Sequence, residues 1–311
     1  MAKISIENID EIKVNVIPVE RRFDSEGELA IDERIRQIYE DNNYDLRPKT
    51  SEEADARGEK HFNGLMSSAP KIQSYPVNGK NFVTVDIAPT RYLIGQAMRD
   101  YVKENEVSEK EVQKISPDMT GVSLIVPVKI NGDYYLLSQV KGKALGSGQI
   151  HAGLVAGNVD AKYLNQPDPL ITTLQNECSE ELGLNLSYLD STSFIFLIDE
   201  RETGQVNFAS VAMNADVQEI LTAYESMTRQ KLKKDEKLEV MGLANLPVAG
   251  ISLTPLENGS SGVKDITCYM PSSEGLVKLV EERGVRPYTS ATIDYVSEPK
   301  NTRFLLEKAG Y

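Results

Sequence analysis

An amphipathic helix is the feature that most restricts the fold of this chain. Its apolar positions recur every four residues, at Leu170, Leu174, Cys178 and Leu182. This spacing gives the helix an apolar stripe, so the helix must pack on a core. Pro169 is tolerated in a first helical turn and Gly183 is a favoured stop. The sequence therefore predicts a helix over about 169–182 inside a folded domain.

The same helix carries glutamates at positions 177, 180 and 181, which meet on one helical face. Like charges this close cost an isolated helix about 0.2–0.5 kcal/mol per pair, and a divalent cation bound by carboxylate oxygens would remove that cost. His61 and His151 are far apart and no cysteines are paired in spacing, so the chain has no zinc-site pattern. We interpret Glu177, Glu180 and Glu181 as a Mg²⁺ (or Mn²⁺) site; the alternative is a solvated acidic face.

Composition excludes several classes of function. With 34 basic and 47 acidic side chains the formal charge is −13, which disfavours a nucleic-acid partner. No apolar run approaches the roughly 20 residues needed to cross a bilayer, and the N-terminus lacks a signal-peptide pattern. Cys178 and Cys268 are far apart, and Cys178 falls on the apolar stripe, so a disulfide is not expected. These features predict a cytoplasmic protein that binds neither nucleic acid nor membrane.

The length of 311 residues allows two domains of ordinary size. We place a smaller α+β domain at 1–117, a second domain at 118–285 and a C-terminal arm at 286–311. Asn78-Gly79 and Asn131-Gly132 are type I′ hairpin signals between apolar runs. Strands are expected over 4–19, 72–88, 121–130, 134–140, 194–198, 205–213 and 238–243, and helices over 25–43, 89–105, 169–182, 217–234 and 273–283.

The acidic helix resembles part of the signature of the Nudix hydrolases, G-x5-E-x7-R-E-U-x-E-E-x-G-U, in which U is aliphatic. The second half matches closely: Glu177 falls on the first helix glutamate, Cys178 on U, Glu180 and Glu181 on the glutamate pair, Gly183 on the glycine and Leu184 on the last U. The preceding order of strand, Asn-Gly hairpin, strand and glycine loop is also that of the family. The resemblance covers roughly residues 118 to 285.

The first half of the signature departs from the family pattern. Asp168 and Asn176 stand at the spacing of the family's Glu and Arg, so both partners of that ion pair are replaced by shorter polar residues. We expect them to share a weaker hydrogen bond. Gly157 lies eleven residues before Asp168 rather than six, which indicates an insertion of about five residues in the loop.

The resemblance implies an α/β fold, a Nudix-type α/β/α sandwich with a mixed sheet, preceded by the α+β domain. It implies a metal-dependent hydrolase with a small-molecule nucleotide substrate, in which Glu177, Glu180 and Glu181 are catalytic and hold the metal. Glu239, with Glu236 as an alternative, is a candidate base or ligand in a region where relatives often place a glutamate; the other interpretation is a charged loop. Gly157 and the pair Lys141 and Lys143 are candidate substrate contacts, although lysines near a glycine loop are often only solvated.

Several alternatives remain open. A Nudix fold that senses a nucleotide without cleaving it is the strongest alternative, because the signature's Arg and Glu are lost. An isomerase acting on a diphosphate is a weaker alternative. Such relatives use a cysteine and histidine ligands, and this chain has few residues of either type. His61-Phe62-Asn63-Gly64 and Thr90-Arg91-Tyr92 are faintly similar to eukaryotic UDP-sugar pyrophosphatases of the superfamily. The N-terminal domain could close over the substrate or form a homodimer.

Overall fold

The computed structural model describes most of the chain. The described residues are 4–17, 65–105, 116–141, 149–200, 204–234, 248–256, 267–272, 275–279 and 287–311, with small gaps near residue 106 and a few isolated residues between these ranges. The helix expected over 25–43, apart from the helical Gln37, lies outside the described residues. So do the strand expected over 238–243 and the residues Glu236, Glu239 and Lys143.

The chain forms two compact units, each assembled from several segments. The first unit contains Met1–Val122, Asn158–Thr173 and Phe196–Phe208, and the second contains Ser123–Gly157, Leu174–Ile195 and Ala209–Tyr311. The proposed domain boundaries near 117 and 285 stay predictions.

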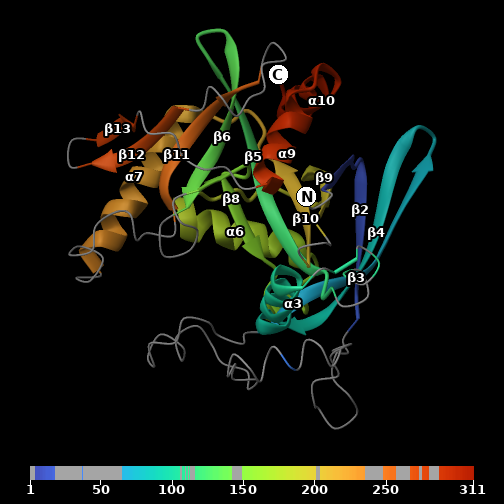
Figure 1. The fold of residues 1–311 in the computed structure, drawn as a ribbon. Helices are drawn as coiled ribbons and strands as arrows, with labels where there is room; N and C mark the ends of the chain where they lie inside the picture. Colours follow the sequence, from blue (N-terminus) through green and yellow to red (C-terminus); the bar gives the residue numbers. More distant parts are fainter. Residues whose placement is uncertain are drawn as a thin grey trace. The chain divides into compact units, whose positions relative to one another are not determined.

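The first unit is built on a mixed set of strands followed by a helix (Figure 1). Strand β4 pairs in parallel with β2 and antiparallel with β3, and β1 pairs antiparallel with β9. The elements are β1 (Ser5–Asn8), β2 (Glu11–Val16), β3 (Leu65–Val77), β4 (Lys80–Arg91), α3 (Tyr92–Glu104), η1 (Ala161–Tyr163) and parts of β5, β9 and β10. The strand expected over 4–19 is thus divided into β1 and β2, with Asp10 at the break, where its carboxylate accepts from the Asn81 N–H.

The second unit contains most of the acidic helix and a sheet in which β5-β6-β11-β12-β13 follow one another, each strand antiparallel to the next. Strand β7 pairs with β6 and β8 with β5, while β9 and β10, which are neighbours in the sheet, contribute residues to both units. The strands are β5 (Met119–Ile130), β6 (Asp133–Lys141), β7 (Ile150–His151), β8 (Val155–Asn158), β9 (Phe194–Glu200), β10 (Gln205–Val211), β11 (Val248–Pro255), β12 (Thr267–Ser272) and β13 (Gly275–Leu279). The helices are α6 (Pro169–Leu182), η2 (Ser191–Ser193), α7 (Val217–Lys234), α9 (Pro287–Ser297) and α10 (Pro299–Ala309).

Both predicted hairpin turns are confirmed. Asn78 and Gly79 have φ of 52° and 79°, and Asn131 and Gly132 have φ of 53° and 102°. Positive φ at both central residues defines a type I′ turn, which matches the twist of the flanking strands. The turns join β3 to β4 and β5 to β6 (Figure 1).

Two C-terminal predictions differ from the structure. The helix expected over 273–283 is wrong where residues are described, because Gly275–Leu279 forms β13 and pairs antiparallel with β12. Backbone pairing with β12, rather than the local spacing of apolar residues, determines the conformation of this segment. The stretch expected to be an arm contains helices α9 and α10. The buried Ile293 and Leu305 show that these helices contribute to the core of the second unit.

The mixed α/β class predicted from the sequence is confirmed, with a mixed sheet and helices beside it. Among the described residues, none of the helices is both long and apolar enough to cross a bilayer.

Candidate active site

Helix α6 has the predicted bounds, and both of its ends have a physical cause. At its start, the Asp168 carboxylate accepts from the N–H of Ile171 at 3.1 Å, as a capping residue does. At its end, Gly183 has φ of +70°, a left-handed conformation that favours glycine. Asp168 thus caps the helix, a role that the sequence analysis did not predict. A hydrogen bond between Asp168 and Asn176 stays a prediction.

The apolar stripe of α6 is buried as predicted. The side chains of Leu170, Leu174, Cys178 and Leu182 are all fully shielded from solvent. Burial raises the pKa of the Cys178 thiol, and the nearby carboxylates of Glu181 and Glu177 raise it further. The thiol is therefore a packing group rather than a nucleophile.

The three glutamates of α6 differ in their exposure to solvent. Glu180 is exposed, Glu177 is half-buried, and Glu181 is only 7% exposed. Glu181 follows Leu174 by seven residues, which is close to two helical turns, so it lies on the same stripe as the apolar residues. Its position on the helix explains why its charge is buried and needs a partner.

Glu177 lies directly against the backbone of β8. A Cβ built on Gly157 would overlap the Glu177 carboxylate and approach its Cγ to 2.8 Å. Glycine is thus the residue that lets the carboxylate come this close to the strand. The structure brings together Gly157, a predicted substrate contact, and Glu177, a predicted metal ligand.

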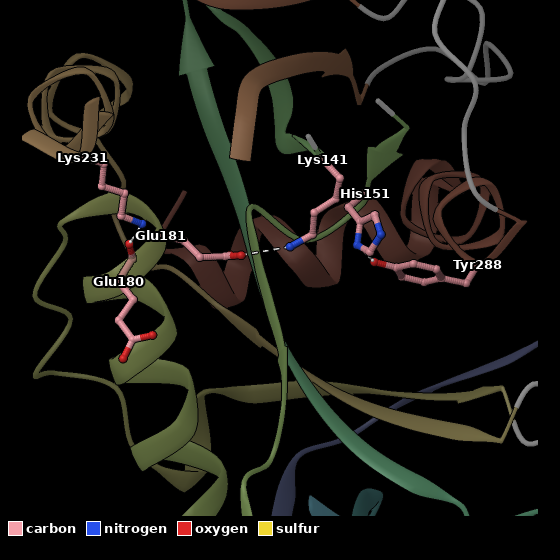
Figure 2. A network of polar contacts seen from close by, with 6 residues as sticks. All are labelled: Lys141, His151, Glu180, Glu181, Lys231 and Tyr288. Atoms are coloured by element: carbon pink, nitrogen blue, oxygen red, sulfur yellow. Dashed lines mark hydrogen bonds and ion pairs between the residues drawn. The ribbon is translucent and has the colours of Figure 1, made fainter. Parts of the chain in front are cut away.

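Glu181 is held by a lysine from β6. The Nζ of Lys141 donates to its Oε1 at 2.9 Å, and the two side chains point toward one another in Figure 2. Lys141 is only 9% exposed, so the ion pair is largely shielded from water. The second oxygen, Oε2, is buried and has no hydrogen-bond partner among the described residues. Lys141 therefore contacts the acidic helix itself, a different role from the predicted contact with a substrate phosphate.

A second lysine, Lys231 on α7, also lies by the glutamates. Its Nζ donates to the backbone carbonyl of Glu180 (Figure 2). Burial lowers the pKa of Lys231, and the charges of Glu181, Glu180 and Glu177 oppose this change. The sequence analysis missed this residue because α7 begins well beyond the signature and the contact spans 51 residues. Lysines from β6 and α7 thus partly compensate the acidic helix.

A polar pair lies next to Lys141 in the same unit. The Tyr288 hydroxyl and the Nδ1 of His151 are 2.7 Å apart, and their rings meet edge to face with centroids 5.1 Å apart. Figure 2 shows this pair beside Lys141, on the side away from Glu180. Tyr288 has no signal in the sequence, since it is 137 residues from His151.

The residues present match a divalent metal in chemistry but not in arrangement. Carboxylates are the ligands that Mg²⁺ prefers, and the Oε2 of Glu181 is a buried acceptor without a partner. Within the described part of the chain, however, no group of three His, Cys, Asp or Glu side chains is placed to hold an ion. The Lys141 contact holds Glu181 in the observed conformation, so a metal at this helix requires a rearrangement of that side chain.

A cavity of about 190 Å³ lies at the C-terminal end of α6 in the second unit. Its wall includes Leu124, Val126 and Leu154, and Asp216 and Glu219 contribute carboxylates. No lysine, arginine or histidine is among the described residues that line the cavity. The two carboxylates therefore disfavour a phosphate there.

The comparisons with known proteins give little beyond this. No protein-family model matches the sequence, and the search of curated proteins gave no significant match. Among solved structures, the chain is similar to the crystal structure of a MutT/nudix family protein from Enterococcus faecalis, with 8% identity and a TM-score of 0.30, over 67% of this chain and 72% of that one. A likeness of this degree carries no functional argument.

Proposed function

We propose that this protein is a metal-dependent hydrolase that cleaves the pyrophosphate of a nucleoside diphosphate linked to another moiety, such as a sugar or ribose phosphate. The main support for the proposal is the close contact of the Glu177 side chain with Gly157 on β8. The acidic helix and the glycine strand of the Nudix-like sequence pattern are thus in contact, which supports the proposal. Glu180 and Glu181, one turn further on, supply the remaining carboxylates.

Glu177, Glu180 and Glu181 would hold the ion, with Glu181 released from Lys141. When bound, Mg²⁺ or Mn²⁺ supplies charge stabilisation for the phosphates and lowers the pKa of an attacking water. The general base, proposed as Glu239 or Glu236, stays a prediction.

The chain's own residues have distinct tasks in this proposal. Gly157 leaves the space beside β8 that the Glu177 carboxylate occupies. Lys141 balances the buried charge of Glu181 before substrate arrives. If Glu181 held a metal, the Lys141 ammonium would be available to an anionic phosphate oxygen. The same lysine would then serve the resting site and the substrate complex.

The test is product formation across a panel of nucleotide-sugars and ADP-ribose, with and without Mg²⁺. We expect a nucleoside monophosphate and a phosphorylated partner from at least one compound, only when metal is present. Glu177→Gln should abolish that product, whereas Glu225→Gln, which alters an i,i+4 surface pair with Arg229 on α7, should leave it unchanged. Equal product from wild type and Glu177→Gln would overturn the proposal.

The second candidate is a nucleotide sensor that does not cleave its ligand. The observation that favours it is the compensation of the acidic helix by Lys141 and Lys231, which supplies positive charge without a metal. In that case nucleotide should raise the melting temperature by mass action and be recovered intact. Magnesium affinity does not separate the two candidates, so product must be measured.

A further inference from the structure

A strip of buried polar side chains runs along β6 and β7 beside the acidic helix. Gln139 and Lys141 are two residues apart on β6, so their side chains leave the same face of the sheet. His151 on β7 is the register partner of Gln139 and lies on that face too. None of these side chains has a role in the cleavage chemistry proposed above except Lys141.

Gln139 is the unusual member of this strip. It is fully buried, yet neither its Oε1 nor its Nε2 has a hydrogen-bond partner among the described residues. The Oε2 of Glu181, at the other end of the Lys141 ion pair, is in the same condition. Buried polar groups are nearly always hydrogen-bonded, because leaving them unpaired disfavours the folded state. Both side chains therefore have hydrogen-bonding capacity that the described residues leave open.

The strip is held at both ends. Toward α6 it ends in the ion pair of Lys141 with Glu181, and toward α9 it ends in the 2.7 Å contact of His151 with Tyr288. The hydroxyl of Thr289 accepts from the Ala152 N–H at 3.2 Å and fixes the first turn of α9 beside β7. The polar groups are thus presented by a sheet and two helices rather than by surface loops, which favours a defined ligand geometry.

The open atoms define the ligand's chemistry. The Oε1 of Gln139 and the Oε2 of Glu181 can only accept hydrogen bonds, and the Nε2 of Gln139 can only donate them. A phosphoryl group only accepts and would leave both acceptors unpaired, and an ammonium only donates. Neighbouring hydroxyls, each of which both donates and accepts, satisfy all of these conditions.

We propose that Gln139 forms a subsite for the vicinal hydroxyls of a sugar. This inference rests on the proposed function, because it identifies the sugar part of the nucleotide substrate as the group that the strip recognises. The hydroxyls could belong to a sugar beyond the diphosphate or to the ribose of the nucleoside. Both sources offer the same diol chemistry.

The experiment is calorimetric titration of wild type and Gln139→Leu in Mg²⁺. The α,β-methylene analogue of ADP-ribose against α,β-methylene-ADP tests the distal sugar, and ADP against 2′,3′-dideoxy-ADP tests the nucleoside ribose. In wild type we expect the compound with the additional hydroxyls to bind roughly tenfold more tightly in one of the two pairs. In Gln139→Leu that ratio should fall to about twofold or less, with little change for the compound that lacks them.

Folding is controlled by circular dichroism, and Gln139→Met is the second variant if Gln139→Leu does not fold. The matched control is Gln175→Leu, because the half-buried Gln175 amide already donates to the carbonyls of Leu186 and Leu189. That variant should keep the wild-type ratio. Equal ratios in wild type and both Gln139 variants, or no preference for hydroxyls in wild type, would mean that ordered water fills the strip and would overturn the proposal.

Cleavage is measured in parallel so that the two proposals fail separately. A hydroxyl preference that depends on Gln139, without any cleavage of ADP-ribose, would support the proposed subsite and contradict the proposed hydrolase activity. Cleavage without a hydroxyl preference keeps the hydrolase and removes the subsite.

Discussion

The apolar residues and the glutamates of helix α6 owe their environments to different causes. The apolar stripe of Leu170, Leu174, Cys178 and Leu182 is uniformly buried, as its spacing alone requires. The carboxylates beside it are graded from exposed Glu180 to buried Glu181. Their environments depend on Gly157, Lys141 and Lys231, which come from other elements. Local spacing sets the packing of the helix, whereas distant residues set its chemistry.

The largest effect is expected where a charge lies inside the buried stripe. Lys141→Met leaves the Glu181 carboxylate buried without its partner, and should destabilise the protein by roughly 3–5 kcal/mol in urea unfolding. The double variant Lys141→Met/Glu181→Leu removes both charges and should be closer to wild type than the single variant. A single variant as stable as wild type would show that the ion pair is not shielded from water.

The apolar stripe should be nearly as sensitive. Leu174→Ala removes a fully buried side chain and should cost roughly 2–5 kcal/mol of unfolding free energy. The control is Leu65→Ala, the same change at a residue that is 39% exposed, which should have a much smaller effect. Equal effects at the two positions would contradict the orientation of α6.

Paired glycine variants separate chemistry from packing. In Gly157→Ala the new Cβ meets only the flexible Glu177 side chain, so the fold should persist while turnover falls by at least about tenfold. In Gly153→Ala the Cβ would lie 2.8 Å from the carbonyl oxygen of Val155, so stability itself should fall. Urea midpoints and initial rates measure the two outcomes. Wild-type turnover in Gly157→Ala would contradict the claim that activity requires the close contact of Glu177 with β8.

The smallest expected effect concerns the thiol within the apolar stripe. Cys178 is fully buried and its pKa is raised by burial and by Glu181 and Glu177, so iodoacetamide should not modify it in the folded protein. A Cys268→Ser background leaves Cys178 as the remaining thiol. Mass spectrometry before and after unfolding in urea gives the result, and rapid labelling of the folded protein would place the stripe at the surface.

The sequence was sufficient for features with a local cause. The bounds of α6 and both Asn-Gly turns follow from residues within a few positions of one another. The contact of Lys141 with Glu181 spans 40 residues and that of Tyr288 with His151 spans 137, so no local pattern encodes them. The strand β13 was missed for the same reason, because its pairing with β12 overrides the local spacing.

Isotope transfer from water is the most direct test of the central claim that the carboxylates of α6 serve pyrophosphate hydrolysis. The cleavable substrate from the nucleotide panel, or ADP-ribose if none is cleaved, is incubated with saturating Mg²⁺ in oxygen-18 water and analysed by mass spectrometry. The account predicts one labelled phosphate oxygen per cleavage in the wild-type reaction and none with Glu177→Gln. Intact, unlabelled ligand recovered from the wild-type protein, with its melting temperature raised, would contradict the hydrolase and favour the sensor.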